Sequence, residues 1–177
     1  MTDRDMELRS NETPEARFRI VFSHLGAITA YARRRGSLDA DALAAEVMTI
    51  AWRRLSDVPR DDPRPWLYAT ARNLLLAQMR QSGIARRHRS DGPAPEPAPE
   101  VFELDPELVS ALRELSPLDR EALLLTAWEE LTPKEAARAL GIKPTAFRVR
   151  LLRARRRVEA KLAASSISEN RLTMERT

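Results

Sequence analysis

Apolar residues recur at three- and four-residue steps along most of this chain, which is the spacing of an amphipathic helix. In the first half, the pattern predicts one helix over 15–36, a second that starts at about Asp39 and stops before Pro59, and a third from Pro65 or Trp66. The expected inner positions are Phe18, Val21, Phe22, Leu25, Ile28, Ala32, Leu43, Val47, Ile50, Ala51, Leu67, Ala71, Leu74, Leu75, Gln78 and Met79.

The second half shows the same helical spacing, with clearer start signals. A helix is predicted over 108–115, and Ser116 should cap the next one, with Pro117 at the first helical position and Asp119 at the third. The inner positions expected on that helix are Ala122, Leu123, Leu125, Ala127 and Trp128. Beyond Ala164 the chain becomes polar, so residues 165–177 are predicted to be a frayed tail.

Between the two halves lies a stretch of different composition. Residues 91–107 hold five prolines and six acidic residues, with no lysine or arginine. Since proline fixes φ and donates no backbone hydrogen bond, this stretch should be an extended, semi-rigid linker. The expected fold is therefore all-α, with small helical domains over 15–90 and 108–164. Residues 1–14 are polar and are expected to form a disordered arm.

The strongest local pattern is that of a helix-turn-helix within the second domain. Thr132 and Glu135 fit a capping box, and Pro133 takes the tolerated first helical position. Gly141 then suits the left-handed residue that ends a helix, and the next helix begins near Pro144. Two short helices joined by a tight glycine turn favour DNA binding.

The helix after the turn carries an excess of positive charge. Residues 143–161 contain eight basic residues and one acid, Glu159. Such a helix can place side chains on base edges and phosphates of the major groove. The alternative is a solvated arginine-rich helix in an ordinary bundle. The positions expected to face inward are Phe147, Leu151, Ala154, Val158 and Leu162.

Bulk composition narrows the classes of function. The chain has 177 residues, 43% hydrophobic and 32% charged, with a net charge of +4. It has no cysteine and only two separated histidines, His24 and His88, which argues against a disulfide framework or a metal cluster. Without a nucleophile set or a phosphate-binding glycine loop, neither an enzyme nor a cofactor is expected. Without a signal peptide or a membrane-length apolar run, a cytoplasmic location is expected.

Three stretches of the chain resemble a known family. They are Asp41-Ala-Leu-Ala-Ala-Glu46-Val-Met-Thr-Ile-Ala-Trp52-Arg53, Pro65-Trp66-Leu-Tyr-Ala-Thr-Ala-Arg72-Asn73, and the helix-turn-helix with its ending Arg150-Leu-Leu-Arg153-Ala-Arg155. In this order, and with an acidic linker between them, they resemble the extracytoplasmic-function sigma factors of the sigma-70 family over about residues 15–162. The resemblance implies a factor that binds core RNA polymerase and directs promoter-specific transcription initiation.

The resemblance also implies roles for individual residues. The core polymerase-binding positions would be Asp41, Glu46, Thr49 and Arg53. The positions at the melted −10 element, with the loop 56–65, would be Trp66, Arg72, Asn73, Arg80, Arg86 and Arg87. The positions at the double-stranded −35 element would be Lys143, Thr145, Arg148, Val149, Arg150, Leu152, Arg153, Arg155 and Arg156. The acidic linker is similar to one that threads the polymerase cleft, and an inhibitory anti-sigma protein is an expected partner.

The chain departs from the family pattern at two places. The docking helix usually contains Asp-Leu-Val-Gln-Glu, whereas Ala42 and Ala45 replace the aspartate and the glutamine here. Lys143 and Pro144 stand where the family has a serine cap. The first departure leaves open an alternative function, a stand-alone helix-turn-helix regulator that has lost polymerase docking.

Several of these residues also have a purely structural interpretation. Trp52, Trp66 and Trp128 can be core residues, and Glu46 and Asn73 can be ordinary surface positions. The basic run 80–89 can be a solvated helix end, and His24 and His88 can be unremarkable surface or partly buried residues.

Overall fold

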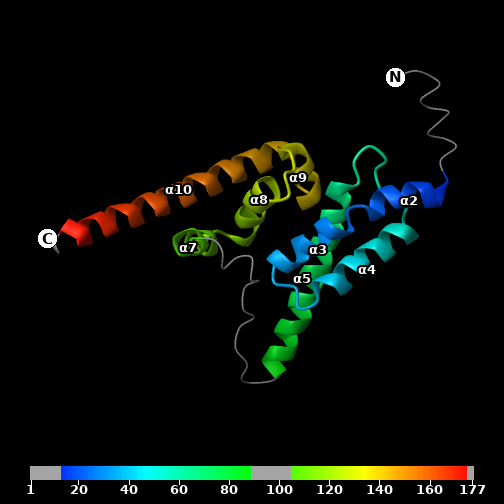
Figure 1. Ribbon diagram of the computed structural model, residues 1–177, viewed down its shortest axis with the longest axis horizontal. Coiled ribbons are helices and arrows are strands. Elements are labelled where there is room, and N and C mark those ends of the chain that lie inside the picture. Colours follow the sequence, from blue (N-terminus) through cyan, green and yellow to red (C-terminus); the bar gives the residue numbers. More distant parts are fainter. Residues whose placement is uncertain (1–12, 89–104, 175–177) are drawn as a thin grey trace, which may run out of the picture. The chain divides into compact units, whose positions relative to one another are not determined.

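The computed structural model describes residues 13–88 and 105–174, with side chains described for 13–81 and 105–164. The chain divides into two compact units, residues 1–94 and 95–177. Within the described residues every regular element is a helix (Figure 1). The prediction of an all-α fold is confirmed.

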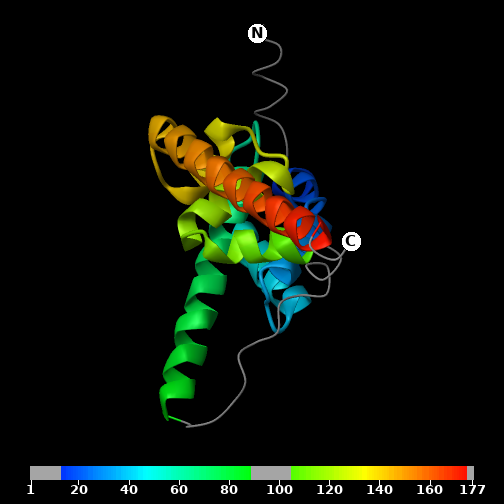
Figure 2. The same cartoon turned by 90° about the vertical axis from the view of Figure 1, so that its left-hand side faces the viewer.

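Unit 1 is built from helices α2 (Pro14–Phe22), α3 (Leu25–Arg34), α4 (Ala40–Arg53) and α5 (Arg64–His88). Helices α3, α4 and α5 pack on one another, and α2 lies against α4. The far half of α5 extends beyond the other helices of its unit (Figures 1 and 2). The buried core consists of Val21, Ile28, Tyr31, Ala32, Leu43, Ala44, Val47, Met48, Ala51, Val58, Leu67, Tyr68, Ala71 and Leu75.

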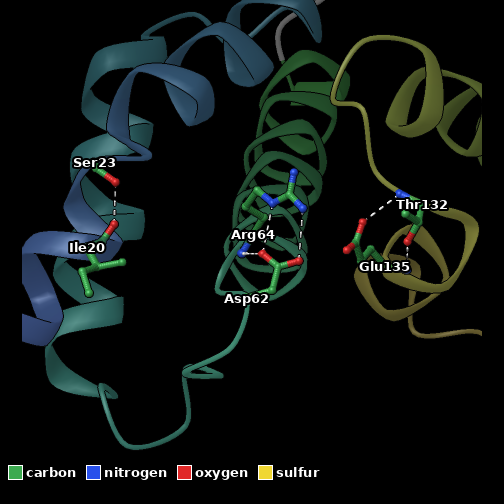
Figure 3. Close-up of polar contacts among 6 residues, drawn as sticks. All are labelled: Ile20, Ser23, Asp62, Arg64, Thr132 and Glu135. Carbon is green, nitrogen blue, oxygen red and sulfur yellow. Dashed lines mark hydrogen bonds and ion pairs between the residues drawn. The ribbon is translucent and has the colours of Figure 1, made fainter. Parts of the chain in front are cut away.

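The single helix predicted over 15–36 is instead two helices, α2 and α3, separated at Ser23 and His24. The Ser23 hydroxyl donates to the carbonyl of Ile20 at 2.6 Å (Figure 3), and the His24 N–H donates to Val21 at 3.2 Å. These short-range bonds compete with the regular helical ladder and end α2. As a result Phe22, which was expected to face inward, is 49% exposed.

The end of α3 and the start of α4 lie close to the predicted positions, residue 36 and Asp39, and both are defined by local hydrogen bonds. Gly36 adopts a φ of 74°, and the Ser37 N–H returns to the carbonyl of Ala32 at 3.0 Å, so α3 closes in a Schellman-type turn. The carboxylate of Asp39 then caps α4 by accepting the N–H of Ala42 at 2.8 Å.

Unit 2 is built from α7 (Pro106–Glu114), α8 (Pro117–Ala127), α9 (Pro133–Leu140) and α10 (Pro144–Met174). The long helix α10 packs against each of the other three. The side chain of Arg120 on α8 caps the end of α7, donating to the carbonyls of Leu112 at 2.7 Å and Arg113 at 2.8 Å. The buried core consists of Ala111, Leu112, Leu115, Ala122, Leu124, Leu125, Leu131, Ala136, Ala137, Ala139, Leu140, Phe147, Leu151, Ala154 and Val158.

Three predicted boundaries differ from the structure. Helix α10 runs to Met174 through most of the predicted tail, because helix propagation needs no buried face once the helix has formed. Helix α5 includes most of the basic run 80–89. Helix α7 begins inside the predicted linker, where Asp105 caps it and Pro106 takes the first helical position. The rest of the linker prediction, over 91–104, lies outside the described residues, as does most of the predicted arm.

Besides Phe22, two predicted inner positions are exposed, and several others are only half-buried, namely Phe18, Leu25, Ile50, Leu74, Gln78, Leu123, Trp128 and Leu162. Met79, on α5, is 60% exposed. Ala127 is exposed at the last turn of α8, and Trp128, which caps that helix, is half-buried.

Candidate nucleic-acid and polymerase-binding surfaces

The helix-turn-helix of α9 and α10 has the geometry that its sequence predicts. The N–H of Thr132 donates to the Glu135 carboxylate at 2.7 Å, and the N–H of Glu135 donates to the Thr132 hydroxyl at 3.3 Å (Figure 3). At the other end of α9, Gly141 has a φ of 66° and the Ile142 N–H donates to Ala137 at 3.0 Å. The turn between the two helices is therefore defined by backbone conformation at Gly141.

Substitution of this glycine should cost stability through strain alone. A Cβ at Gly141 would meet no heavy atom within 4 Å, so only the left-handed backbone is penalised. We expect Gly141→Ala to lower the free energy of unfolding of unit 2 by about 1–2 kcal/mol in urea denaturation followed by circular dichroism. Gly26→Ala is the control. It lies within α3, also meets nothing within 4 Å, and should be neutral or slightly stabilising. Equal effects of the two variants would contradict this account.

Helix α10 presents a basic and apolar outer face. Phe147, Leu151, Ala154 and Val158 are buried, as predicted for its inner face. Eight of the nine residues predicted for the −35 element are exposed, namely Lys143, Thr145, Arg148, Val149, Leu152, Arg153, Arg155 and Arg156. Val149 is 49% and Leu152 is 50% exposed, so both aliphatic side chains are accessible for contact with thymine methyl groups.

Arg150, the ninth residue of this set, is engaged within the protein. Its guanidinium is 2.7 Å from one carboxylate oxygen of Asp119, on α8, and Arg157 is 3.3 Å from the other oxygen. The Asp119 residue is only 7% exposed. The sequence pattern predicts Asp119 at the third position of α8 but indicates no partner for it, because the three residues are far apart along the chain.

The pKa of Asp119 reflects these contacts. Burial of the carboxyl group, the largest single effect, raises its pKa, but hydrogen bonds from Ser116 and Arg150 and the charges of Arg150 and Arg157 together outweigh it. The pKa of Asp119 therefore lies below its ordinary value. Since the folded-state pKa is lowered, these contacts stabilise unit 2 at neutral pH, and that stabilisation is lost as the pH falls through the folded-state pKa.

Helix α4 separates its residues sharply into two faces. Leu43, Ala44, Val47, Met48 and Ala51 are buried in the core of unit 1. The four residues predicted to bind polymerase all lie exposed on the opposite face, and these are Asp41, Glu46, Thr49 and Arg53. The replacements Ala42 and Ala45 are exposed on this face as well, so the face is intact but less polar than the family pattern.

Beside this face lies an aromatic patch that the apolar pattern of the sequence does not predict. Phe18 and Phe22 of α2 and Trp52 of α4 line a shallow surface groove bordered by Glu15 and Arg19. The rings of Phe18 and Trp52 meet edge to face at 5.0 Å, and those of Phe18 and Phe22 are 5.9 Å apart.

Trp52 was interpreted as a core residue, yet it is 46% exposed. It follows Thr49 by three residues and precedes Arg53, both assigned to the outer face, so helical spacing alone could have located it.

The loop that connects α4 to α5 is held in place from several sides. Val58 is buried within it, and the guanidinium of Arg17, on α2, donates to the Val58 carbonyl. At the start of α5, the Asp62 carboxylate accepts the backbone N–H of Arg64 at 3.1 Å and its guanidinium at 3.0 and 3.3 Å (Figure 3). His24, between α2 and α3, also lies near the start of α5: its burial and the nearby charge of Arg64 lower its pKa. The loop is therefore preorganised on unit 1.

The residues predicted for the −10 element are distributed along α5. Trp66 and Arg72 are half-buried, and Asn73 and Arg80 are exposed. The guanidinium of Arg80 also donates to the carbonyl of Leu76 at 3.1 Å. The side chains of Arg86 and Arg87 lie outside the described residues.

The described residues contain no group of three or more histidine or acidic side chains placed to hold a metal ion. Among them, no helix has the length and apolar character needed to cross a membrane.

Both units match models of known protein families. The model described as Sigma-70 region 2 matches residues 20–90, and that described as Sigma-70, region 4 matches residues 106–158. The chain belongs to the sigma-70 family, and is of the extracytoplasmic-function type. It is a sigma factor that acts in promoter-specific transcription initiation with RNA polymerase.

Individual relatives agree with this assignment. The RNA polymerase sigma factor NccH of Alcaligenes xylosoxydans xylosoxydans is 29% identical over 166 residues, covering 84% of this chain and 87% of the relative. Among solved structures, CnrH in complex with the cytosolic domain of CnrY is 26% identical with a TM-score of 0.59, covering 86% and 90% of the two chains. Sigma factor RpoE, solved with the anti-sigma factor NepR from Bartonella quintana, shares the fold at 24% identity and a TM-score of 0.62, covering 82% and 95%.

Proposed function

We propose that the two units divide promoter recognition between them, with unit 2 reading the −35 element and unit 1 binding core polymerase and the melted −10 element. The observation that carries this proposal is the exposed basic face of α10, which follows a correctly capped helix-turn-helix. A helix of this kind enters the major groove with its N-terminal residues on base edges and flanking cations on phosphates.

On α10, position along the helix separates two kinds of contact. Arg148, Val149, Leu152 and Arg153 lie on successive turns near the start of the helix and are the proposed base-reading residues. Arginine pairs with guanine through two hydrogen bonds, and aliphatic side chains contact thymine methyl groups. The proposed phosphate-binding residues are Lys143, Thr145, Arg155 and Arg156. Lys143 and Pro144 set the entry of the helix and are where sequence preference should differ from that of relatives.

On unit 1, the outer face of α4 is the proposed polymerase-binding surface. The aromatic patch adds to the surface formed by its four predicted residues, because Trp52 lies on the same exposed face as Thr49 and Arg53. Apolar and aromatic side chains usually supply most of the binding energy at the centre of an interface. The aromatic patch therefore supplies affinity that Ala42 and Ala45 do not.

The preorganised loop and the start of α5 are the proposed −10 reader. Melted bases are splayed out and stack on protein side chains, while cationic side chains bind the phosphate backbone of the strand. Such a site needs a rigid surface with cations nearby. Asn73 and Arg80 are exposed on α5 for this role, and Trp66 and Arg72 are partly accessible. We propose the same role for Arg86 and Arg87 further along the helix.

The chain should contribute no catalytic chemistry of its own, because nucleotide addition is performed by the polymerase. Its place of action is then the cytoplasm, where transcription occurs. We also propose control by an inhibitory anti-sigma protein. The structure of the relative CnrH holds the cytosolic domain of CnrY, and an exposed aromatic patch on a DNA-binding factor suits reversible coverage by a partner.

The direct test is run-off transcription with purified core polymerase on a promoter library. We expect transcripts from promoters that share two spaced elements. We expect Arg148→Ala to lower selection at one base pair of the upstream element by about 1–3 kcal/mol, that is, roughly five- to 150-fold. Arg113→Ala, an exposed arginine on α7, is the matched control and should leave selection unchanged. DNA binding without any capture of core polymerase would instead favour the stand-alone regulator.

A further inference from the structure

We propose that Asp119 is a specificity-determining residue of the −35 reader, whose carboxylate withholds Arg150 from DNA. The inference rests on the proposed DNA-binding role of α10 and adds a residue of α8 to it. Asp119 itself does not lie on the outer face of α10. It acts through the arginine that it holds.

Asp119 on α8 forms ion pairs with two arginines of α10, Arg150 and Arg157. Each of its carboxylate oxygens is paired with a different arginine of α10, Arg150 at 2.7 Å and Arg157 at 3.3 Å. Its own backbone is fixed in the first turn of α8, where its N–H donates to the Ser116 hydroxyl at 3.2 Å. The acidic group also suits the positive end of the α8 dipole. The carboxylate is therefore held on α8 and in turn holds α10.

The two arginines are held to different degrees. The Arg150 side chain is 34% exposed, against 61% for Arg157, and Arg150 makes the shorter contact. Arg150 lies between the proposed base-reading pairs 148–149 and 152–153. Since it directly follows Val149 and stands two residues before Leu152, its long side chain would be within reach of a DNA phosphate if it were released.

Release of Arg150 would change the kind of binding as well as its strength. A cation on a phosphate binds every sequence alike, and each such contact steepens the dependence of log affinity on log salt by about 1. Non-specific binding would therefore tighten. At the same time α10 would lose a contact that fixes its rotation on α8, so binding of the correct −35 sequence would not gain equally. Both effects lower the ratio of specific to non-specific affinity.

The test compares Asp119→Asn with Glu159→Gln in the holoenzyme formed with core polymerase. Both variants remove one negative charge from unit 2, but Glu159 is exposed on α10, whereas Asp119 is buried against two arginines. The probes are a duplex with the upstream element selected by the wild-type factor and a random-sequence duplex, each titrated at several salt concentrations. We expect Asp119→Asn to steepen the salt dependence on the random duplex by about 1 and to lower the specificity ratio. Glu159→Gln should change neither to that extent.

A second comparison keeps the test decisive if Asp119→Asn folds poorly. If Arg150 is withheld, Arg150→Gln should leave the salt dependence of the wild type unchanged, whereas Arg155→Gln should reduce it by about 1. In the double variant Asp119→Asn with Arg150→Gln, the steepening should disappear, which a purely structural role for Asp119 would not produce.

The outcomes distinguish a failure of the proposed DNA-binding role of α10 from a failure of the proposed role of Asp119. A wild-type holoenzyme that shows no preference for any upstream element would overturn the proposed function of α10. A clear preference, together with equal effects of Asp119→Asn and Glu159→Gln, would overturn the withholding role alone. So would a reduced salt dependence in Arg150→Gln that matches the reduction in Arg155→Gln.

Discussion

Replacement of Phe147 by alanine should destabilise unit 2 by about 3–5 kcal/mol, the usual cost of removing a buried aromatic side chain. Phe147 is fully buried at the start of α10, next to the turn that joins it to α9. The cavity would lie beneath the base-reading residues, so both the stability and the placement of the recognition helix should suffer. A loss of this size is a large share of the total stability of a small domain.

Hydrogen exchange followed by mass spectrometry can measure this effect in the full chain, unit by unit. We expect protection to fall in α8, α9 and the first half of α10, while α3 and α4 keep wild-type protection. Upstream-element selection should be lost, and capture of core polymerase through unit 1 should persist. For stability and hydrogen exchange alone, Leu152→Ala is the matched control on the same helix, since Leu152 is 50% exposed and its loss should cost no more than about 0.5 kcal/mol. Loss of protection in both units alike would contradict independent folding of unit 2.

Helix boundaries set by local hydrogen bonds could be predicted from the sequence. Thr132 and Glu135 cap one another three residues apart, and Gly141 accepts a left-handed backbone that other residues resist. Each signal depends only on near neighbours, so no tertiary information is needed. The buried positions of α10 followed in the same way from helical spacing.

The break between α2 and α3 was missed for an equally local reason. The apolar spacing of Phe18, Val21 and Phe22 continues through Ser23 without interruption. What ends the helix is a side-chain hydrogen bond from Ser23 to Ile20, which competes with the backbone but leaves no mark on the apolar pattern. Consequently the exposure of Phe22 could not be predicted from periodicity alone.

The ion pairs of Asp119 with Arg150 and Arg157 depend on long-range packing. Asp119 and Arg150 are 31 residues apart, and their contact follows from the way α8 crosses α10. From the sequence alone, Arg150 looked like one more cation on the recognition helix. Only the fold distinguishes an arginine committed to an internal carboxylate from those that are exposed on the outer face.

Replacement of Trp52 by alanine should weaken binding to core polymerase by about thirtyfold, the equivalent of about 2 kcal/mol for an aromatic interface anchor. Trp52 combines a large exposed apolar area with a fixed orientation, because its ring packs edge to face on Phe18. A preordered aromatic ring loses little conformational entropy on binding, so most of its buried area contributes to affinity. Competition between the variant and the wild-type factor for limiting core polymerase measures the loss.

Position, rather than mere apolar exposure, should decide the size of this effect. Leu38 is 90% exposed in the turn before α4, outside the aromatic patch, so Leu38→Ala should leave polymerase affinity unchanged. Phe22→Ala, which removes a ring of the patch that packs on Phe18, should have an intermediate effect. Trp52→Ala with unaltered polymerase affinity would show that the patch serves another partner. In that case the remaining polar residues of the α4 face would have to account for docking despite Ala42 and Ala45.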